Sequence, residues 1–109
     1  MTPKSAVMGL CLGLTVFTAA GTAYAGPAVS TRWRETGMTQ DECFKYAETA
    51  IEAAGFGRIE RTTQSRYGTR GEYTAAIRCI VDHKVIFFIV AGPSLQQAPK
   101  YLDDIYDHF

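Results

Sequence analysis

The sequence lacks an excess of charge of either sign, since its 109 residues carry 11 basic and 11 acidic side chains. A dedicated nucleic-acid-binding protein normally has a basic surplus, so this balance argues against nucleic acid as a partner. The chain also lacks repeats and low-complexity segments. Its 47% of hydrophobic and 20% of charged residues indicate a globular protein rather than a disordered one. The length allows one small domain.

Histidine and cysteine are scarce, with two and three residues respectively, and no catalytic signature combines them. Cys79 and His83 would form a nucleophile pair only if the cysteine were a free thiol with a third, orienting group nearby. Asp104 and His108 lie one helical turn apart and could offer two ligands to a metal such as zinc, but no further histidine or cysteine accompanies them. We therefore predict no catalytic residue, no metal site and no cofactor.

Residues 1–25 have the three parts of a cleavable signal peptide. Lys4 supplies the positive start, residues 6–20 form an uncharged apolar run, and small residues at Ala23 and Ala25 form the cleavage pattern. The run is short for a membrane span, and an uncleaved anchor is the alternative. We predict cleavage after Ala25, a periplasmic or secreted protein, and no stable membrane anchor after cleavage.

Cleavage would leave two cysteines, Cys43 and Cys79, in an oxidising compartment. Two cysteines in a small exported domain indicate one disulfide, and two unpaired buried thiols are the alternative. The chain-entropy model assigns about 3–4 kcal/mol of stability to a closed loop of this size. A domain this small has little stability to spare, so this bond could decide whether the chain folds.

Residues 26–38 show no periodicity, and we expect an extended lead-in whose Trp33 packs against the domain; an aromatic contact site beside two arginines is the alternative. A helix should begin at Thr39, because Thr39 and Glu42 match a capping box. Gly55 should end this helix as a left-handed cap. The residues of its expected apolar face are Cys43, Ala47, Ala50, Ile51 and Ala54.

Three strands are predicted to follow, at residues 58–64, 72–81 and 85–91. Residues 65–71 contain two glycines and are expected to form a loop. The polar turn at residues 82–84 is short, so the last two strands should be antiparallel. The chain ends in a helix that begins at Ser94 or at Ala98, with Pro99 in the first turn, where proline is tolerated.

These elements predict a small two-layer α+β domain at residues 39–109, in the order helix, three-stranded antiparallel meander, helix (αβββα), with one disulfide. Cys79 would then identify the inner face of the middle strand. Residues 85–91 are apolar on both sides, so large apolar side chains must also lie on the outer face, whatever the register. We take Val81 to lie opposite Val85, and a slip of one residue would exchange the two sets. The predicted outer apolar residues are Ile80, Ile86, Phe88 and Val90.

An apolar outer face needs a cover, which could be the C-terminal helix, the lead-in with Trp33, a partner protein, or a second copy in a homodimer. A second candidate surface is the glycine-containing loop with Arg66, Tyr67 and Arg70. This loop could hold an anionic ligand such as a phosphate, a sugar acid or an acidic protein patch. The alternative is that its arginines pair with the acidic helices.

These features together indicate a small exported protein that is a non-enzymatic interaction module. One alternative is an inhibitor or immunity protein that plugs an exported enzyme with the Tyr67 loop. Another is a small enzyme or metal-binding protein that uses His83 or the Asp104–His108 pair. The order of elements alone predicts no activity, because one fold hosts many functions.

Overall fold

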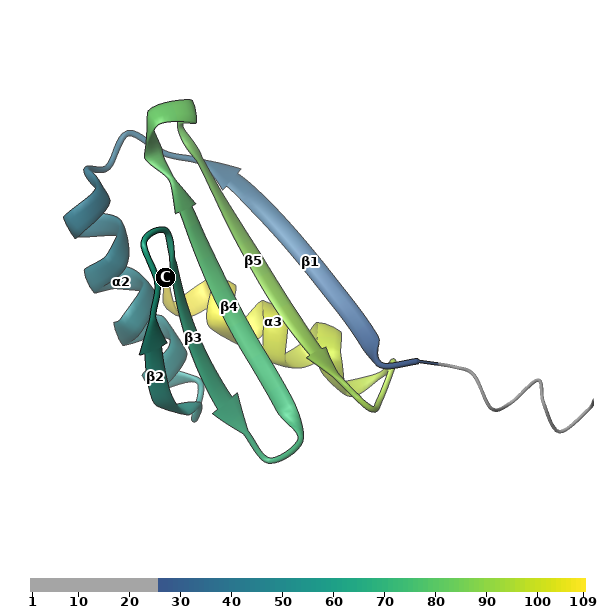
Figure 1. Cartoon of the computed structure of the whole chain (residues 1–109). Coiled ribbons are helices and arrows are strands. Elements are labelled where there is room, and N and C mark those ends of the chain that lie inside the picture. Colours follow the sequence, from purple (N-terminus) through teal and green to yellow (C-terminus); the bar gives the residue numbers. More distant parts are fainter. Residues whose placement is uncertain (1–25) are drawn as a thin grey trace, which may run out of the picture.

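The computed structural model describes residues 26–109, which form one sheet with two helices packed against the same side (Figure 1). The predicted signal peptide lies outside the described residues. The elements are β1 (Ala28–Glu35), α2 (Gln40–Ala53), β2 (Gly57–Arg61), β3 (Ser65–Arg70), β4 (Tyr73–Ile80), the 3-10 turn η2 (Val81–His83), β5 (Val85–Gly92) and α3 (Gln97–His108). The α+β class is confirmed, but the sheet has five strands instead of the predicted three.

The strands lie in the order β1-β5-β4-β3-β2, and every neighbouring pair is antiparallel. Strands β2 to β5 form a meander, in which each strand turns back beside the one before it. Strand β1 is separated from this meander by α2 and returns to pair with β5, so the first and last strands of the described residues lie side by side (Figure 1). The meander is therefore one strand longer than predicted, and a fifth strand joins it at one edge.

Strand β1 replaces the unpaired lead-in predicted at residues 26–38, and it pairs with β5 over all eight of its residues. The prediction failed because the strand places Arg32 and Arg34 on the helix side, where a hydrophobic pattern would have apolar residues. The guanidinium of Arg32 lies 3.5 Å from the centre of the Tyr106 ring, so its flat cationic group covers an aromatic face. Trp33 points the opposite way and does not pack into the core as expected.

Strand β3 replaces the loop predicted at residues 65–71, and it pairs with both β2 and β4. Hydrophobic alternation is missing there because the positions that face α2 are Arg66, Gly68 and Arg70. An added Cβ on Gly68 would overlap the side chain of Ile51 on α2. This glycine therefore allows a close approach between strand and helix and does not mark a turn.

Helix α2 begins and ends as predicted. The Thr39 side chain accepts a hydrogen bond from the Glu42 N–H, and the Glu42 carboxylate accepts one from the Thr39 N–H, which completes the capping box. At the other end, Gly55 has a φ of 87°. The Phe56 N–H donates to the Ile51 carbonyl at 3.0 Å, which is the long bond of a Schellman motif.

Helix α3 begins at Gln97, and the Ser94 hydroxyl accepts hydrogen bonds from the N–H groups of Gln96 and Gln97. Pro99 lies in the first turn, as predicted, where its missing N–H leaves no helical bond unmade. The residues that α3 buries are Ala98, Leu102 and Ile105. Within the described part of the chain, neither helix is long and apolar enough to cross a membrane.

The register between β4 and β5 decides which side chains of β5 enter the core. Ile80 lies opposite Val85, whereas the prediction placed Val81 there. Val81 has already left the strand for the turn η2, after which Lys84 takes a φ of 60° and the chain reverses one residue earlier than expected. Three residues predicted to face outward are instead fully buried against the helices: Ile86, Phe88 and Val90. Their β5 neighbours occupy the outer face.

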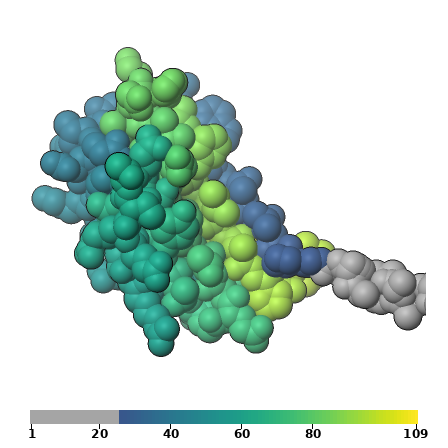
Figure 2. All heavy atoms as spheres, viewed as in Figure 1, coloured from purple at the N-terminus to yellow at the C-terminus, as the bar shows by residue number. Residues whose placement is uncertain are grey.

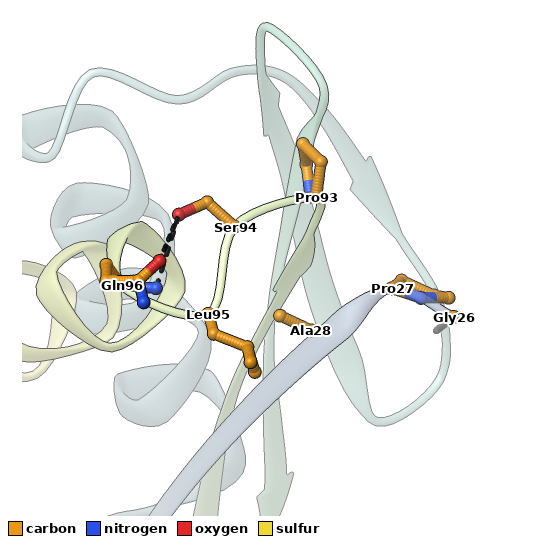
Figure 3. Close-up of a pocket in the computed structure, with 7 residues that line it drawn as sticks. All are labelled: Gly26, Pro27, Ala28, Pro93, Ser94, Leu95 and Gln96. Carbon is orange, nitrogen blue, oxygen red and sulfur yellow. Dashed lines mark hydrogen bonds between the residues drawn. The ribbon is translucent and has the colours of Figure 1, made fainter. Parts of the chain in front are cut away.

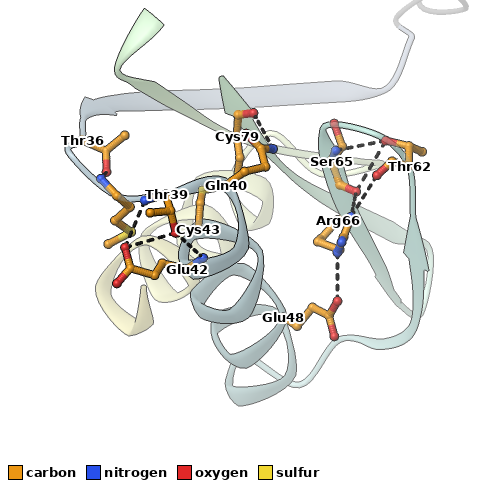
Figure 4. Close-up of a disulfide and its surroundings, with 11 residues drawn as sticks. Thr36, Thr39, Gln40, Glu42, Cys43, Glu48, Thr62, Ser65, Arg66 and Cys79 are labelled. Carbon is orange, nitrogen blue, oxygen red and sulfur yellow. Dashed lines mark hydrogen bonds and ion pairs between the residues drawn. A yellow bond between two sulfur atoms is a disulfide. The ribbon is translucent and has the colours of Figure 1, made fainter. Parts of the chain in front are cut away.

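A disulfide joins Cys43 of α2 to Cys79 of β4, as predicted (Figure 4). Both cysteines are fully buried, and 36 positions of sequence separate them. Close to the bridge, Nε2 of Gln40 donates a hydrogen bond of 3.1 Å to the Cys79 carbonyl. The first turn of α2 is thus attached to the middle strand of the sheet by one covalent bond and one hydrogen bond.

Replacing both cysteines, as Cys43→Ala with Cys79→Ala, should lower the free energy of unfolding by about 3–4 kcal/mol, because the unfolded chain regains the freedom of the closed loop. Urea unfolding followed by circular dichroism measures this loss. Reductant should produce a similar loss in the wild type and no further loss in the double variant. Equal stability of the wild type with and without reductant would contradict the prediction.

Gly92→Ala should also destabilise the fold, because an added Cβ would overlap the ring of Tyr73. That ring is held in place by its hydroxyl, which accepts a hydrogen bond of 3.1 Å from the Ser94 N–H. Overpacking of this kind costs about 1–3 kcal/mol. Gly37→Ala is the matched control, since nothing lies within 4 Å of its added Cβ. Thermal unfolding should separate the two variants, and equal melting temperatures would show that the Tyr73 ring can move aside.

Candidate interaction surface

The sheet has one face that neither helix covers, and the strand register assigns its residues, because directly opposite residues of an antiparallel pair project to the same side. We call this surface the open face. Its apolar residues are Val29 and Trp33 on β1, Val85, Phe87, Ile89 and Ala91 on β5, Ala76 and Ile80 on β4, and Tyr67 on β3. In Figure 2, atoms of the central strands form the near surface, with no helix over them.

Two aromatic side chains lie next to each other on the open face. Trp33 is directly opposite Phe87 in the ladder, and the two residues are 58% and 38% exposed. Val29 on the same strand is 61% exposed. Single exposed apolar residues are ordinary, but an apolar surface that continues across neighbouring strands indicates an interaction site.

Charged side chains lie toward the margins of the open face. Glu35 is at the end of β1, and Glu60 is on the edge strand β2. Arg78 starts on β4 but reaches across β3, where its Nη2 donates to Oε1 of Gln64 at 2.6 Å. An apolar centre with polar groups around it is the arrangement found in protein–protein interfaces.

The sequence indicated that an apolar outer face exists, but it named the wrong residues for most of it. Of the predicted set, Ile80 alone lies on the open face. Trp33 and Val29 were missed, although their alternation with Thr31 is a strand pattern that could have identified β1. The residues of β5 could not be assigned without the register, because both of its faces are apolar.

The three residues of the predicted anion-binding loop do not lie together, because they alternate across β3. Tyr67 belongs to the open face, whereas Arg66 and Arg70 face the helices. The Arg66 side chain is 12% exposed, and its guanidinium lies 3.5 Å from the centre of the Phe44 ring. Its Nε donates to Oε2 of Glu48 at 2.9 Å (Figure 4). Arg66 is therefore engaged within the protein.

Arg70 is engaged at the opposite end of α2. Its Nη1 donates to the Ala54 carbonyl at 2.8 Å, and its guanidinium lies 4.6 Å from the centre of the Tyr101 ring. Ala54 caps the C-terminus of α2, where unpaired carbonyls favour a cation. Residues 65–70 therefore form a strand, so the predicted loop is wrong, and Arg66 and Arg70 face the helices.

Glu48 connects α2 to β2 and β3 through two arginines. Nε and Nη2 of Arg61 donate to its two carboxylate oxygens at 2.8 and 2.9 Å, and Arg66 adds the bond described above. The hydrogen bond from Arg61 is the largest reason why the pKa of Glu48 lies below its usual value. Partial burial opposes this shift, and the hydrogen bond from Arg66 and the charges of both arginines add to it. The carboxylate is thus held ionised as part of the fold.

The two pairs of residues weighed for chemistry lie on different elements, and only Asp104 and His108 are in contact, with Nδ1 of His108 3.4 Å from Oδ1 of Asp104. Cys79 is in the disulfide and supplies no thiol to His83, whose Nδ1 is 3.6 Å from Oδ1 of Asp82 on the surface. On α3, Nδ1 of His108 lies 2.8 Å from the carbonyl oxygen of Asp104. Within the described residues, no three His, Cys, Asp or Glu side chains are grouped so that they could hold a metal ion.

A hollow of about 570 Å³ lies between the start of β1 and the loop that leads into α3 (Figure 3). The residues that line it are Gly26, Pro27, Ala28, Pro93, Ser94, Leu95 and Gln96. None of these side chains titrates, and the Ser94 hydroxyl already accepts the two N–H groups at the start of α3. No side chain that lines the hollow is therefore suited to acid–base chemistry.

Comparison with known proteins adds no relative from which a role could be transferred. No family model matches the chain, and neither curated proteins nor solved structures contain a match. The interpretation of the open face therefore depends on its own residues, above all on Trp33 and Phe87.

Glu48→Gln should lower the free energy of unfolding by about 1–2 kcal/mol at neutral pH, because it removes charge-assisted hydrogen bonds to two arginines. The folded-state pKa of Glu48 is lowered, so the stabilisation is present above the unfolded-state pKa and disappears as the pH falls through the folded-state value. Calorimetry at a series of pH values should therefore show that the free energies of unfolding of the wild type and the variant converge as the pH falls. Glu60→Gln, on the exposed edge strand, is the control. A stability difference for Glu48→Gln that did not change with pH would contradict this account.

Proposed function

We propose that this protein is an exported, non-enzymatic module that binds a partner protein through the open face. The observation that carries the proposal is the continuous apolar surface around Trp33 and Phe87, which both helices leave uncovered. Surfaces of this kind on folded domains mark interaction sites. An apolar sheet face of this kind suits a partner that presents an apolar surface of its own.

The charges of the open face favour a protein over a lipid surface or a nucleic acid. The charged side chains that the register places there are Glu35, Glu60 and Arg78, so both signs are represented. Binding to an anionic membrane or to nucleic acid depends on a cluster of lysine and arginine. A partner protein needs only an apolar centre and matching polar groups at its margin.

Two aromatic residues on neighbouring strands make suitable anchors for such a contact. Trp33 is held by the β1 ladder and Phe87 by the β5 ladder, so little backbone freedom is lost when a partner binds. Interface residues of this type often contribute about 2 kcal/mol or more each when they are fully desolvated. The polar margin then gives orientation rather than affinity.

Export is part of the proposal and is supported by two features of the chain. The pattern of residues 1–25 is typical of a cleavable signal peptide, which leads to the periplasm or to secretion. The Cys43–Cys79 disulfide suits an oxidising compartment. If the partner is itself an exported enzyme, the protein would act as an inhibitor or immunity protein, with Tyr67 contributing from the open face rather than from a loop.

A photo-crosslinking residue, p-benzoylphenylalanine, introduced at Thr74 on the middle strand of the open face tests this proposal in cells that express the full chain. We expect irradiation to give an adduct with one other protein, identified by mass spectrometry, because the open face is then buried against it. The combined substitution Trp33→Ser with Phe87→Ser should abolish the adduct.

The matched control places the same photo-crosslinking residue at Tyr46, which is 48% exposed on α2. This position should not give the adduct formed at Thr74. The proposal would be wrong if Thr74 gave no adduct, the same adducts as Tyr46, or an adduct with a second copy of the chain.

A further inference from the structure

The two edges of the sheet differ in whether another strand can pair with them. The register of β2 with β3 shifts between Gly57 and Glu60. Arg58, which lies within this segment, has a φ of 55°. A bulge on a short, charged strand prevents pairing with another chain. Strand β1, at the opposite edge, keeps one register over eight residues.

The free side of β1 presents backbone groups at alternate residues. Directly beyond the last pair of the β1–β5 ladder, the Thr36 N–H donates to the Lys84 carbonyl at 3.0 Å. The alternation of an antiparallel ladder then directs the N–H and C=O groups of Val29, Thr31 and Trp33 away from β5 and toward the free edge. No other strand of the described chain pairs with this side.

The two arginines of β1 do not obstruct this edge, because they bind to α3. Nη1 of Arg32 lies 3.2 Å from Oδ1 of Asp103, and Nη2 of Arg34 donates to the Tyr106 carbonyl at 3.0 Å. Both guanidinium groups lie over the Tyr106 ring, at 3.5 and 4.2 Å from its centre. Charged side chains that point inward usually prevent an edge strand from pairing with another chain. Here both arginines are bound by contacts within the chain.

We propose that two copies of this chain pair through their β1 strands, antiparallel, around a twofold axis that places Thr31 opposite Thr31 of the second copy. The axis is perpendicular to the sheet, so both open faces point to the same side. The two sheets then continue into one another, and the two open faces become one surface. This inference is independent of the proposed function, because it concerns the edge and needs no other protein.

The apolar residues of β1 favour a second copy as the occupant. In this register Val29 lies opposite Trp33 of the second copy, and the same pair occurs twice because the arrangement is symmetric. These two residues are the most exposed large apolar side chains of the strand. Each would be partly covered by an aromatic–aliphatic cross-strand pair, which stabilises antiparallel sheets.

The charge pattern of β1 selects this register among the alternatives. Arg32 lies opposite Ser30, so no two arginines meet. A relative shift of two residues would bring Arg32 opposite Arg32, and a shift of four would bring it opposite Arg34, which places like charges directly across from each other. A shift in the other direction shortens the ladder and brings Pro27, which has no N–H, opposite Trp33.

Sedimentation equilibrium on the protein purified after expression of the full chain, with the disulfide intact, tests the proposal. We expect a monomer–dimer equilibrium with a limiting mass twice that of the monomer. Thr31→Pro should abolish the dimer while leaving the circular dichroism spectrum unchanged, because this N–H is unpaired within one copy. Phe87→Ser is the matched control and should leave the dimer intact, since it alters the open face and not the edge.

A second pair of variants keeps the test valid if proline disturbs the fold. Thr31→Lys and Thr31→Glu should each raise the dimer dissociation constant about tenfold or more, because like charges then meet at the twofold axis. A mixture of the two variants should form a heterodimer. Dimer formation is expected to recover in this mixture only if Thr31 lies opposite Thr31 of the second copy.

A purified wild type that is monomeric at all concentrations would overturn the proposal and leave the photo-crosslinking result untouched. Loss of the dimer in Phe87→Ser but not in Thr31→Pro would also overturn it, by assigning the contact to the open face. A lysine–glutamate mixture that stays monomeric would contradict the proposed register.

Discussion

The bond between Cys43 and Cys79 holds α2 against one face of the middle strand, and the orientation of the whole sheet follows from it. Side chains alternate along a strand, and directly opposite residues share a face, so one inner residue on β4 determines the inner residues of its neighbours. Helix α3 packs beside α2 on that same face. The result is a two-layer fold with a single core and one face without a cover.

Strand β5 is apolar on both faces, although this fold covers only one of them. Strands that are apolar on both faces usually lie in sheets that are covered on both sides, but here the helices cover only the side of Phe88. Its other side carries Phe87 beside Trp33 of β1. The two proposed contacts use different parts of this region, since a partner would occupy the face and a second copy would occupy the edge. They are compatible, because pairing through β1 would cover Val29 and Trp33 only in part and would join the two open faces into one surface.

Arginine residues on the helix side of β1 and β3 are the reason why these two strands are not predicted from the sequence. Four of the helix-facing positions of β1 and β3 are occupied by arginine, at Arg32, Arg34, Arg66 and Arg70. A guanidinium is flat and weakly hydrated, so it can lie on an aromatic ring and still donate to a carboxylate or carbonyl. The ring and the acceptor are supplied by helix residues such as Phe44 and Tyr106, which lie far away in the sequence. Pattern analysis therefore takes both strands for irregular segments.

The sequence alone determined the limits of α2, the pairing of Cys43 with Cys79, the hairpin of the last two strands and the presence of a second apolar face. These features follow from local chemistry: a capping box, a left-handed glycine, thiol pairing and a run of apolar residues. The tertiary structure decided that β1 returns to β5, that the arginines turn inward, and that Trp33 and Phe87 are the aromatic residues left outside. Those outcomes depend on contacts between distant segments and on where one turn begins, and a shift of one residue at Val81 exchanges the two faces of β5.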